Sequence, residues 1–373
     1  MTTLERLAEL GQSVWIDYIR RRMLEDGELA RLIAQGVRGL TSNPTIFEQA
    51  IGDSDDYDAA IRADADPTDA RALFDRLARE DVARAADLFR PLYDRTDGLD
   101  GYVSIEVAPG LARDAAGTVA EARRLWRDLD RPNVMIKVPG TMEGLFAIRT
   151  LIADGVNVNV TLIFSRERYR AVLEAWAAGL EDRLAAGRPV GRVASVASFF
   201  VSRVDTLVDR RLEALAAARP DRAAALLALR GRAAVANAKL AYRVFAETLA
   251  TPRVRALLAR GARPQRPLWA STSTKNPAYP DLLYVEPLIG PHTVNTVPPK
   301  TLAALLDHGR VARTVDSGWD DAEAVLATLE AEGIDLAEVT AQLEAEGVAA
   351  FARSEETLLE RLRAKVSALG ARG

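Results

Sequence analysis

The sequence contains no cysteine, and histidine occurs twice, at His292 and His308. Disulfides, thiolate zinc sites, iron–sulfur clusters and a cysteine nucleophile are therefore excluded, and an all-histidine metal site is difficult to build. Any catalytic chemistry must come from carboxylates, lysine, arginine, serine, threonine or tyrosine.

Long apolar runs are also lacking, since none approaches the ~18 residues of a membrane helix. The first residues carry Glu5, Arg6 and Glu9 where a signal peptide would have its apolar core. The formal net charge of −4, with 49% hydrophobic and 27% charged residues, disfavours disorder and bulk nucleic-acid binding. We expect a cytoplasmic globular protein with no nucleic-acid or membrane partner.

Eight short, mostly apolar runs rich in β-branched residues are typical of buried parallel strands. They lie at 13–18, 37–42, 102–107, 133–139, 156–164, 191–200, 267–272 and 292–298. Stretches with helical spacing separate them, and no GxGxxG motif follows an early strand to support dinucleotide binding. Eight strand–helix units favour a closed (β/α)8 TIM barrel over an open doubly wound sheet.

Two stretches, 51–97 and 216–262, are longer than a strand–helix unit needs, and we expect inserted helices there. The tail 316–373 has helical spacing throughout, with Gly333, Gly347 and Gly370 as expected helix stops. The acidic run 52–58 lacks the ligand pattern of an EF-hand, so a solvated loop or helix start is expected. With no repeat or linker, residues 1–373 are predicted to form one domain.

Polar residues stand at or near the ends of the first seven expected strands. In a (β/α)8 barrel these ends meet at one rim, where such enzymes carry their active sites. The residues are Asp17, Asn43, Glu106, Lys137, Thr161, Ser198 and Ser271.

Lys137 lies between Ile136 and Val138 in an apolar strand. In a dry barrel mouth, desolvation would lower the pKa of this lysine and leave an amine able to attack a carbonyl. The alternative is a strand-end lysine that extends to solvent or pairs with an acid.

Asp17 and Glu106 also allow two interpretations. Each carboxylate could simply pair with an arginine. Around a lysine amine, the same two groups would supply a proton acceptor for a substrate hydroxyl and a proton donor for water leaving a carbinolamine.

Two later segments favour phosphate binding, since barrel phosphate sites often follow strands seven and eight. Ser198 and Arg203 stand within one strand-to-helix turn, and residues 271–276 add four hydroxyls and Lys275. Serine and threonine at these points could equally serve as helix caps.

These residues resemble the transaldolase family. The resemblance rests on TSNPT (41–45), SIEV (104–107), IKVPGTMEGLFAI (136–148), GVNVNVTLIFS (155–165) and SFFVSRVD (198–205), together with Asp17. It extends into ASTSTKNP (270–277) and GVAAFARSEETLLERL (347–362), as in the longer bacterial branch of the family.

The resemblance implies Schiff-base transfer of a dihydroxyacetone unit from sedoheptulose 7-phosphate to glyceraldehyde 3-phosphate in the non-oxidative pentose phosphate pathway. The products are erythrose 4-phosphate and fructose 6-phosphate, and neither a cofactor nor a metal is needed. The enzyme would be a monomer or a homodimer.

The resemblance also implies roles for individual residues. Lys137 would form the Schiff base, Asp17 would take the C4 hydroxyl proton, and Glu106 with Thr161 would hold the catalytic water. The remaining residues would bind the substrate: Asn43 and Asn159 the sugar or the intermediate, and Ser198, Arg203 and Ser271 the phosphate.

Three features bear on this assignment. Shorter members have an arginine two residues after the seventh-strand serine; here Ser273 has that spacing, and Lys275 is the expected replacement. The local pattern of residues 282–290 is typical of a strand, but the resemblance implies that they are helical. Phe200 stands where related aldolases carry tyrosine, which favours transfer over a fructose 6-phosphate aldolase. An inactive sugar-phosphate-binding barrel is a further alternative, against which the complete catalytic set argues.

Overall fold

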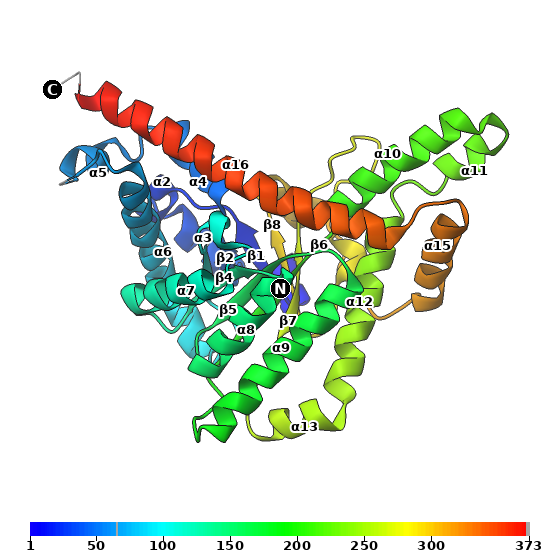
Figure 1. Ribbon diagram of the computed structural model, residues 1–373, viewed down its shortest axis with the longest axis horizontal. Helices are drawn as coiled ribbons and strands as arrows, with labels where there is room; N and C mark the ends of the chain where they lie inside the picture. The colour runs from blue at the N-terminus through cyan, green and yellow to red at the C-terminus, as the bar shows by residue number, and fades with distance from the viewer. Residues whose placement is uncertain (65, 371–373) are drawn as a thin grey trace.

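The computed structural model describes residues 1–64 and 66–370, and its centre is a closed barrel of eight parallel strands in sequential order (Figure 1). The strands are β1 (Gln12–Asp17), β2 (Gly39–Thr41), β3 (Tyr102–Glu106), β4 (Val134–Pro139), β5 (Val158–Ile163), β6 (Ser195–Phe200), β7 (Arg266–Ala270) and β8 (Thr293–Val297). The predicted (β/α)8 barrel and all eight of its strands are confirmed.

Nearly every strand residue is buried, because side chains fill the barrel and helices cover its outer surface. Helix α1 (Thr3–Glu9) precedes β1. The helices that follow β1 to β6 and β8 are α2 (Arg21–Glu25), α3 (Glu28–Gln35), α4 (Pro44–Gly52), α7 (Ala115–Leu129), α8 (Met142–Asp154), α9 (Arg166–Ala185), α10 (Ser202–Ala218) and α14 (Pro299–His308).

Both predicted insertions are helical. The first contains α5 (Asp58–Ala63) and the long α6 (Ala70–Arg95), which packs beside β3. The second contains η2 (Pro220–Arg222), α11 (Ala223–Leu227), α12 (Ala233–Ala250) and α13 (Pro252–Ala259). Of the acidic run 52–58, residues 53–57 link α4 to α5 without regular structure, while Gly52 ends α4 and Asp58 begins α5, in keeping with the expected loop or helix start.

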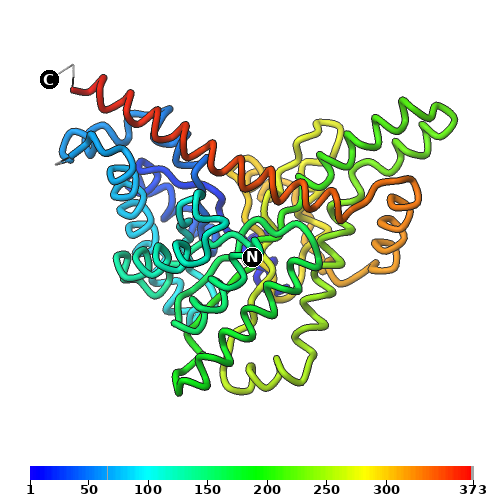
Figure 2. The backbone as a smooth tube through the Cα atoms, in the orientation of Figure 1, coloured from blue at the N-terminus to red at the C-terminus, as the bar shows by residue number. Residues whose placement is uncertain are grey.

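The C-terminal region forms α15 (Trp319–Ala331) and α16 (Leu336–Gly370). Helix α16 crosses one side of the molecule and contacts α4, α5 and α6 toward its C-terminal end and α10 near its start (Figures 1 and 2). The C-terminal extension therefore ties the first insertion to the opposite side of the barrel.

The three predicted helix stops have different outcomes. Gly333 follows the end of α15 with φ +95°, and Gly370 is the last residue of α16. Gly347 was expected to stop the helix, and this prediction is wrong, because α16 continues through it. A Cβ at Gly347 would lie 2.9 Å from Cδ2 of Leu162, so glycine permits close packing of α16 on β5.

The segment 282–290 is not a strand. It contains the short 3₁₀ turn η3 (Glu286–Leu288), preceded by turns, with Pro287 inside it. The helical expectation is met only over these three residues, and the barrel keeps eight strands.

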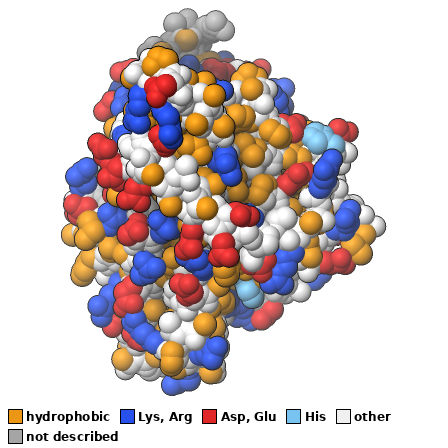
Figure 3. All heavy atoms as spheres, turned by 90° about the vertical axis from the view of Figure 1, so that its right-hand side faces the viewer, with side chains coloured by type: hydrophobic (Ala, Val, Ile, Leu, Met, Phe, Trp, Pro, Cys, Tyr) orange, Lys and Arg blue, Asp and Glu red, His pale blue; other side chains and the backbone are white. Residues whose placement is uncertain are grey.

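Acidic and basic side chains are interspersed over the face that Figure 3 shows, in keeping with the small net charge. Within 1–64 and 66–370, no helix combines the length and apolar character needed to cross a membrane.

Asp100 anchors the end of the barrel where the strands begin. Its carboxylate accepts hydrogen bonds from Ser13 (2.5 Å) and Arg38 (2.7 Å) and lies 3.4 Å from the Arg266 guanidinium. Asp100 and Arg266 are 1% and 6% exposed. This end lies opposite the rim at which the strands terminate, so the network contributes stability and not chemistry.

We predict that Asp100→Ala lowers the free energy of unfolding by about 3–5 kcal/mol, because it leaves the Arg266 charge buried without its partner. Chemical denaturation measures this loss. The matched control is Asp87→Ala at the largely exposed Asp87–Arg131 pair, where about 0–1 kcal/mol is expected. Equal losses in the two variants would show that the Asp100 network is not an anchor.

Candidate active site

Three polar side chains lie next to one another on neighbouring strands, at the end of β3, near the end of β4 and near the start of β5. Glu106 is the register partner of Lys137, and Lys137 is the register partner of Asn159. Register partners on neighbouring strands project from the same face of the sheet, so these three side chains meet inside the barrel mouth.

The Lys137 ammonium is buried and held from two sides. Its Nζ donates to the Ser42 carbonyl oxygen at 2.9 Å and to Oε2 of Glu106 at 3.1 Å. The two side chains of the ion pair are 6% and 7% exposed. Of the two alternatives for this lysine, extension to solvent is excluded, and pairing with an acid is observed. The acid is Glu106, which is itself one of the candidate site residues.

Burial raises the pKa of the Glu106 carboxyl above the usual glutamate value. The Lys137 ammonium acts in the opposite direction, and the negative charges of Asp17 and Glu355 add to the rise. A carboxyl with a raised pKa gives up its proton less readily than an ordinary glutamate, and a general acid needs a proton to deliver.

Asp17 ends β1 and is bound by a hydroxyl. Thr41 donates to Oδ1 of Asp17 at 2.6 Å, and the Thr41 hydroxyl is also 2.6 Å from that of Thr296 on β8. Burial raises the pKa of Asp17, while the Thr41 hydrogen bond and the Lys137 charge lower it. In the described part of the chain neither Asp17 nor Glu106 is ion-paired with an arginine. This geometry favours the chemical interpretation of both carboxylates.

Thr161 presents a hydroxyl without a partner. Its Oγ1 is buried and makes no hydrogen bond to any residue that the structure describes. The register of β5 shifts between Val160 and Ile163, and Leu162 adopts φ +61°, an uncommon value for a residue other than glycine. This irregularity lies beside Thr161, whose hydroxyl remains available to a water molecule or a substrate.

The two candidate asparagines are held in different ways. Ser198 donates to Oδ1 of Asn159 at 2.7 Å, and Nδ2 of Asn159 donates to the Ser104 hydroxyl at 3.0 Å. Oδ1 of Asn43 caps α4 by accepting from the Ile46 amide at 3.0 Å. The Ser198 hydroxyl is thus engaged beside Lys137, and its expected phosphate contact remains a prediction.

Arg203 and Ser271 lie on the other side of the mouth. The Arg203 guanidinium stacks 5.2 Å from the Phe200 ring, and burial lowers its pKa. No acidic side chain in the described ranges forms an ion pair with it. Ser271 has φ +54°, and its hydroxyl is 3.0 Å from that of Ser202 at the start of α10. An unpaired, partly buried arginine beside hydroxyls can bind an anion.

The loop after β7, which carries Ser271 and Lys275, is fastened to α10 by one buried and one partly buried hydrogen bond. Tyr284 donates to Asp205 at 3.0 Å, and Tyr279 donates to Asp209 at 2.6 Å. Burial raises the pKa of Asp205 to about 7. These bonds fix the position of the loop relative to Arg203.

These groups surround one cavity of about 470 Å³ at the barrel mouth. Its lining includes nine of the predicted residues: Asp17, Asn43, Lys137, Thr161, Ser198, Phe200, Arg203, Ser271 and Lys275. Ser273 lines it too, so the geometry brings both alternatives for the second phosphate contact to the same wall. Glu106 and Asn159 do not line this cavity, but each is hydrogen-bonded to a residue that does, Glu106 to Lys137 and Asn159 to Ser198.

Among the cavity residues that the sequence analysis did not single out, three lie close to the candidate catalytic side chains. Thr41 and Thr296 support Asp17, and both lie in segments already singled out as motif or strand. Phe351 comes from α16, and its ring centroid is 5.9 Å from the Lys137 Nζ. No periodicity could bring residue 351 to the barrel mouth, because only the path of α16 does so.

In the described ranges, no group of three or more histidine, cysteine, aspartate or glutamate side chains could hold a metal ion. The groups that this cavity brings together are an amine, two carboxylates, hydroxyls and an arginine with no ion-pair partner in the described ranges.

Comparison with known proteins agrees with this geometry. Residues 14–362 match the family described as transaldolase/fructose-6-phosphate aldolase. A protein named transaldolase from Thermobifida fusca (strain YX) is 50% identical over 368 residues, covering 98% of each chain. Proteins of the same name from Thiobacillus denitrificans (strain ATCC 25259 / T1) and Acidothermus cellulolyticus (strain ATCC 43068 / DSM 8971 / 11B) are 49% and 51% identical, over 97% and 89% of this chain and 100% and 88% of theirs. The chain therefore belongs to the transaldolase/fructose-6-phosphate aldolase family.

Proposed function

We propose that this enzyme is a transaldolase that moves a three-carbon dihydroxyacetone unit from sedoheptulose 7-phosphate to glyceraldehyde 3-phosphate through a Schiff base. The products are erythrose 4-phosphate and fructose 6-phosphate. The observation that carries the proposal is the buried Lys137 amine, 3.1 Å from Glu106 and in one cavity with Asp17 and Arg203.

The first step joins the enzyme to the donor. Lys137 passes a proton to Glu106, and the resulting neutral amine adds to the C2 carbonyl of the ketose and gives a carbinolamine. Glu106 protonates the departing C2 hydroxyl, so that water leaves and the imine forms. The free Thr161 hydroxyl is suited to hold this water, because it is buried and has no protein partner among the described residues.

The second step breaks the carbon–carbon bond. Asp17 accepts the proton of the C4 hydroxyl, the C3–C4 bond electrons move into the protonated imine, and an aldose leaves while an enamine remains on Lys137. The enamine then attacks the aldehyde carbon of the acceptor, and Asp17 returns its proton to the new hydroxyl. Addition of water to the imine, assisted by Glu106, releases the product.

The anion-binding side of the cavity fixes the orientation of each sugar. A phosphate seated on Arg203 and Ser271, with Lys275 or Ser273 at the outer wall, would direct the opposite end of the molecule to Lys137. Asn43 and Asn159 lie on the imine side, where their amide groups would bind sugar hydroxyls.

A fructose 6-phosphate aldolase is the second candidate, since the family description includes it. An aldolase must protonate the enamine and release free dihydroxyacetone. Phe200 lines the cavity with an apolar ring that carries no transferable proton, which favours transfer to an aldehyde. An inactive sugar-phosphate-binding protein would have no need of an amine paired with a carboxylate.

The Schiff base itself is directly testable. Treatment with fructose 6-phosphate and borohydride should attach a dihydroxyacetone-derived or hexose-derived mass to the peptide containing Lys137, because borohydride reduces the imine to a stable secondary amine. Peptide mass spectrometry locates the label, and Lys137→Met is the control. Label on a different lysine, or active enzyme without label, would refute the assignment.

Substitutions of the two carboxylates should impair different steps of the reaction. Asp17→Asn should still form the imine and be trapped as an intact six-carbon adduct, while turnover falls by about 10²-fold or more. Glu106→Gln should instead slow the formation of any adduct. Trapping kinetics with mass analysis distinguish the two variants, and melting temperatures control for structural damage. Three-carbon adducts on Asp17→Asn would disprove the role of Asp17.

Thr41 should set the pH range of cleavage. Because its hydrogen bond lowers the pKa of Asp17, Thr41→Val should move the acid limb of the kcat profile to higher pH, where Asp17 becomes ionised. Thr41→Ser keeps the donor and should leave the limb in place. A limb that does not move in Thr41→Val, or that moves equally in both variants, would contradict this.

A further inference from the structure

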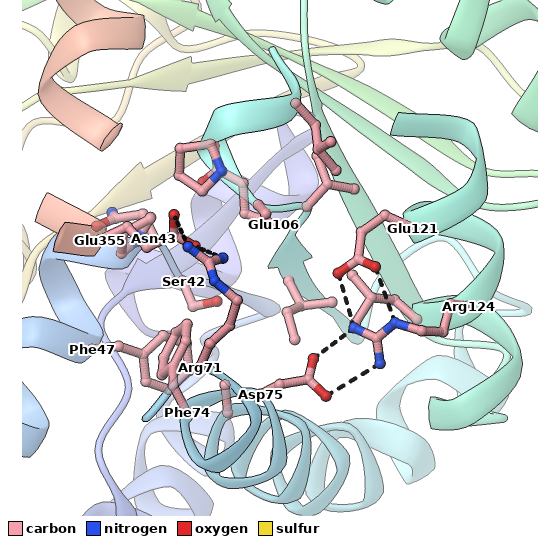
Figure 4. Close-up of a pocket in the computed structure, with 18 of the residues that line it drawn as sticks. Ser42, Asn43, Phe47, Arg71, Phe74, Asp75, Glu106, Glu121, Arg124 and Glu355 are labelled. Atoms are coloured by element: carbon pink, nitrogen blue, oxygen red, sulfur yellow. Dashed lines mark hydrogen bonds and ion pairs between the residues drawn. The ribbon is translucent and has the colours of Figure 1, made fainter. Parts of the chain in front are cut away.

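A second cavity, of about 460 Å³, reaches Glu106 from outside the barrel mouth (Figure 4). Glu106 lines this second cavity, whereas Asp17, Lys137 and Thr161 line the sugar cavity described above. Asn43 lines both. The Lys137–Glu106 ion pair therefore lies at the boundary between the two spaces.

The walls of the second cavity come from α4, α6, α7, the end of β3 and the adjoining turn η1 (Pro109–Leu111), with one residue from α16. Helix α6 belongs to the first insertion and α16 to the C-terminal extension. Much of the wall is apolar, with Phe47, Phe74, Leu111 and Leu125 among its side chains. The insertion and the extension together enclose a space that a bare barrel would leave open.

Both arginines of this cavity are already paired with acidic side chains. Arg71 forms two hydrogen bonds with Glu355, at 2.9 and 3.1 Å, and lies on one side of the space in Figure 4. On the other side Arg124 is bound to Asp75 at 2.7 Å and to Glu121 at 2.8 Å. Because both guanidiniums are neutralised, the cavity is poorly suited to a sugar phosphate.

A small neutral molecule fits these walls better. Water makes few stable contacts with apolar surface and is retained where two or more polar partners converge. Here polar groups stand at the inner end, at Glu106, and at the outer side, at Arg71 and Arg124, with apolar wall between them. Water can pass through such a space without being held in it.

The proposed reaction requires water molecules to leave and to reach the imine. Each imine formation expels one water molecule, and each imine hydrolysis consumes one. At both moments the sugar phosphate fills the cavity on the other side of Lys137. We propose that the second cavity is the route by which the water handled by Glu106 exchanges with solvent, separately from the sugar. This inference rests on the proposed Schiff-base function.

Filling the cavity tests the proposal. Ala78 on α6 lines it and is 3% exposed, so Ala78→Leu adds bulk to the passage without altering a catalytic group. The substrate is fructose 6-phosphate carrying 18O at C2, which leaves as water when the imine forms. In the unmodified enzyme the loss of 18O should keep pace with imine formation, measured by borohydride trapping.

In Ala78→Leu the released water should return to the imine more often than it escapes, so 18O loss per imine formed should fall severalfold. If Ala78→Leu does not fold, Ala72→Leu replaces it, because Ala72 is partly buried in the wall of the same cavity. The matched control is Ala83→Leu, also partly buried on α6 but outside the lining, which should keep the unmodified ratio.

An unchanged ratio in a folded cavity variant would overturn the proposal, as would an unmodified enzyme that forms the imine but retains the label. Absence of any trapped imine in the unmodified enzyme would refute the proposed function itself. The two failures are therefore distinguishable.

Discussion

The ion pair between Lys137 and Glu106 is the interaction on which the rest of the site depends. Two opposite charges can remain this deeply buried because they lie 3.1 Å apart and the ammonium also has the Ser42 carbonyl as a partner. Parallel register between β3 and β4 sets that distance, since Glu106 and Lys137 are opposite one another. The same pair places a carboxyl group beside the amine, as the proposed formation and hydrolysis of an imine require.

The barrel places different groups on the two sides of the Lys137–Glu106 pair. Asp17, on the first strand, is held by Thr41 and faces the same cavity, while Arg203 and the loop after β7 form the side proposed to bind the phosphate. Ion pairs and hydroxyl–carboxylate bonds fix both sides before a substrate arrives, so little reorganisation is needed during the reaction. Helix α16 completes the arrangement by bringing Phe351 against Lys137 and Glu355 toward Glu106.

Much of this could be predicted from the sequence. The strands are short apolar runs, and a polar residue at the end of such a run is conspicuous, as Lys137 and Glu106 are. What the sequence could not provide are contacts between distant segments. Gly347 has the local signature of a helix stop, yet α16 continues through it because tertiary packing on Leu162 outweighs intrinsic propensity. The bond between Thr41 and Asp17 and the approach of Phe351 likewise depend on how the chain closes, not on spacing.

The most direct test of the account is a crystal structure of the enzyme reduced with borohydride in the presence of fructose 6-phosphate. The account predicts continuous density from Nζ of Lys137 to C2 of the sugar. It also predicts that the phosphate lies within hydrogen-bonding distance of Arg203 and Ser271. A sugar attached elsewhere, or a phosphate remote from Arg203, would contradict it.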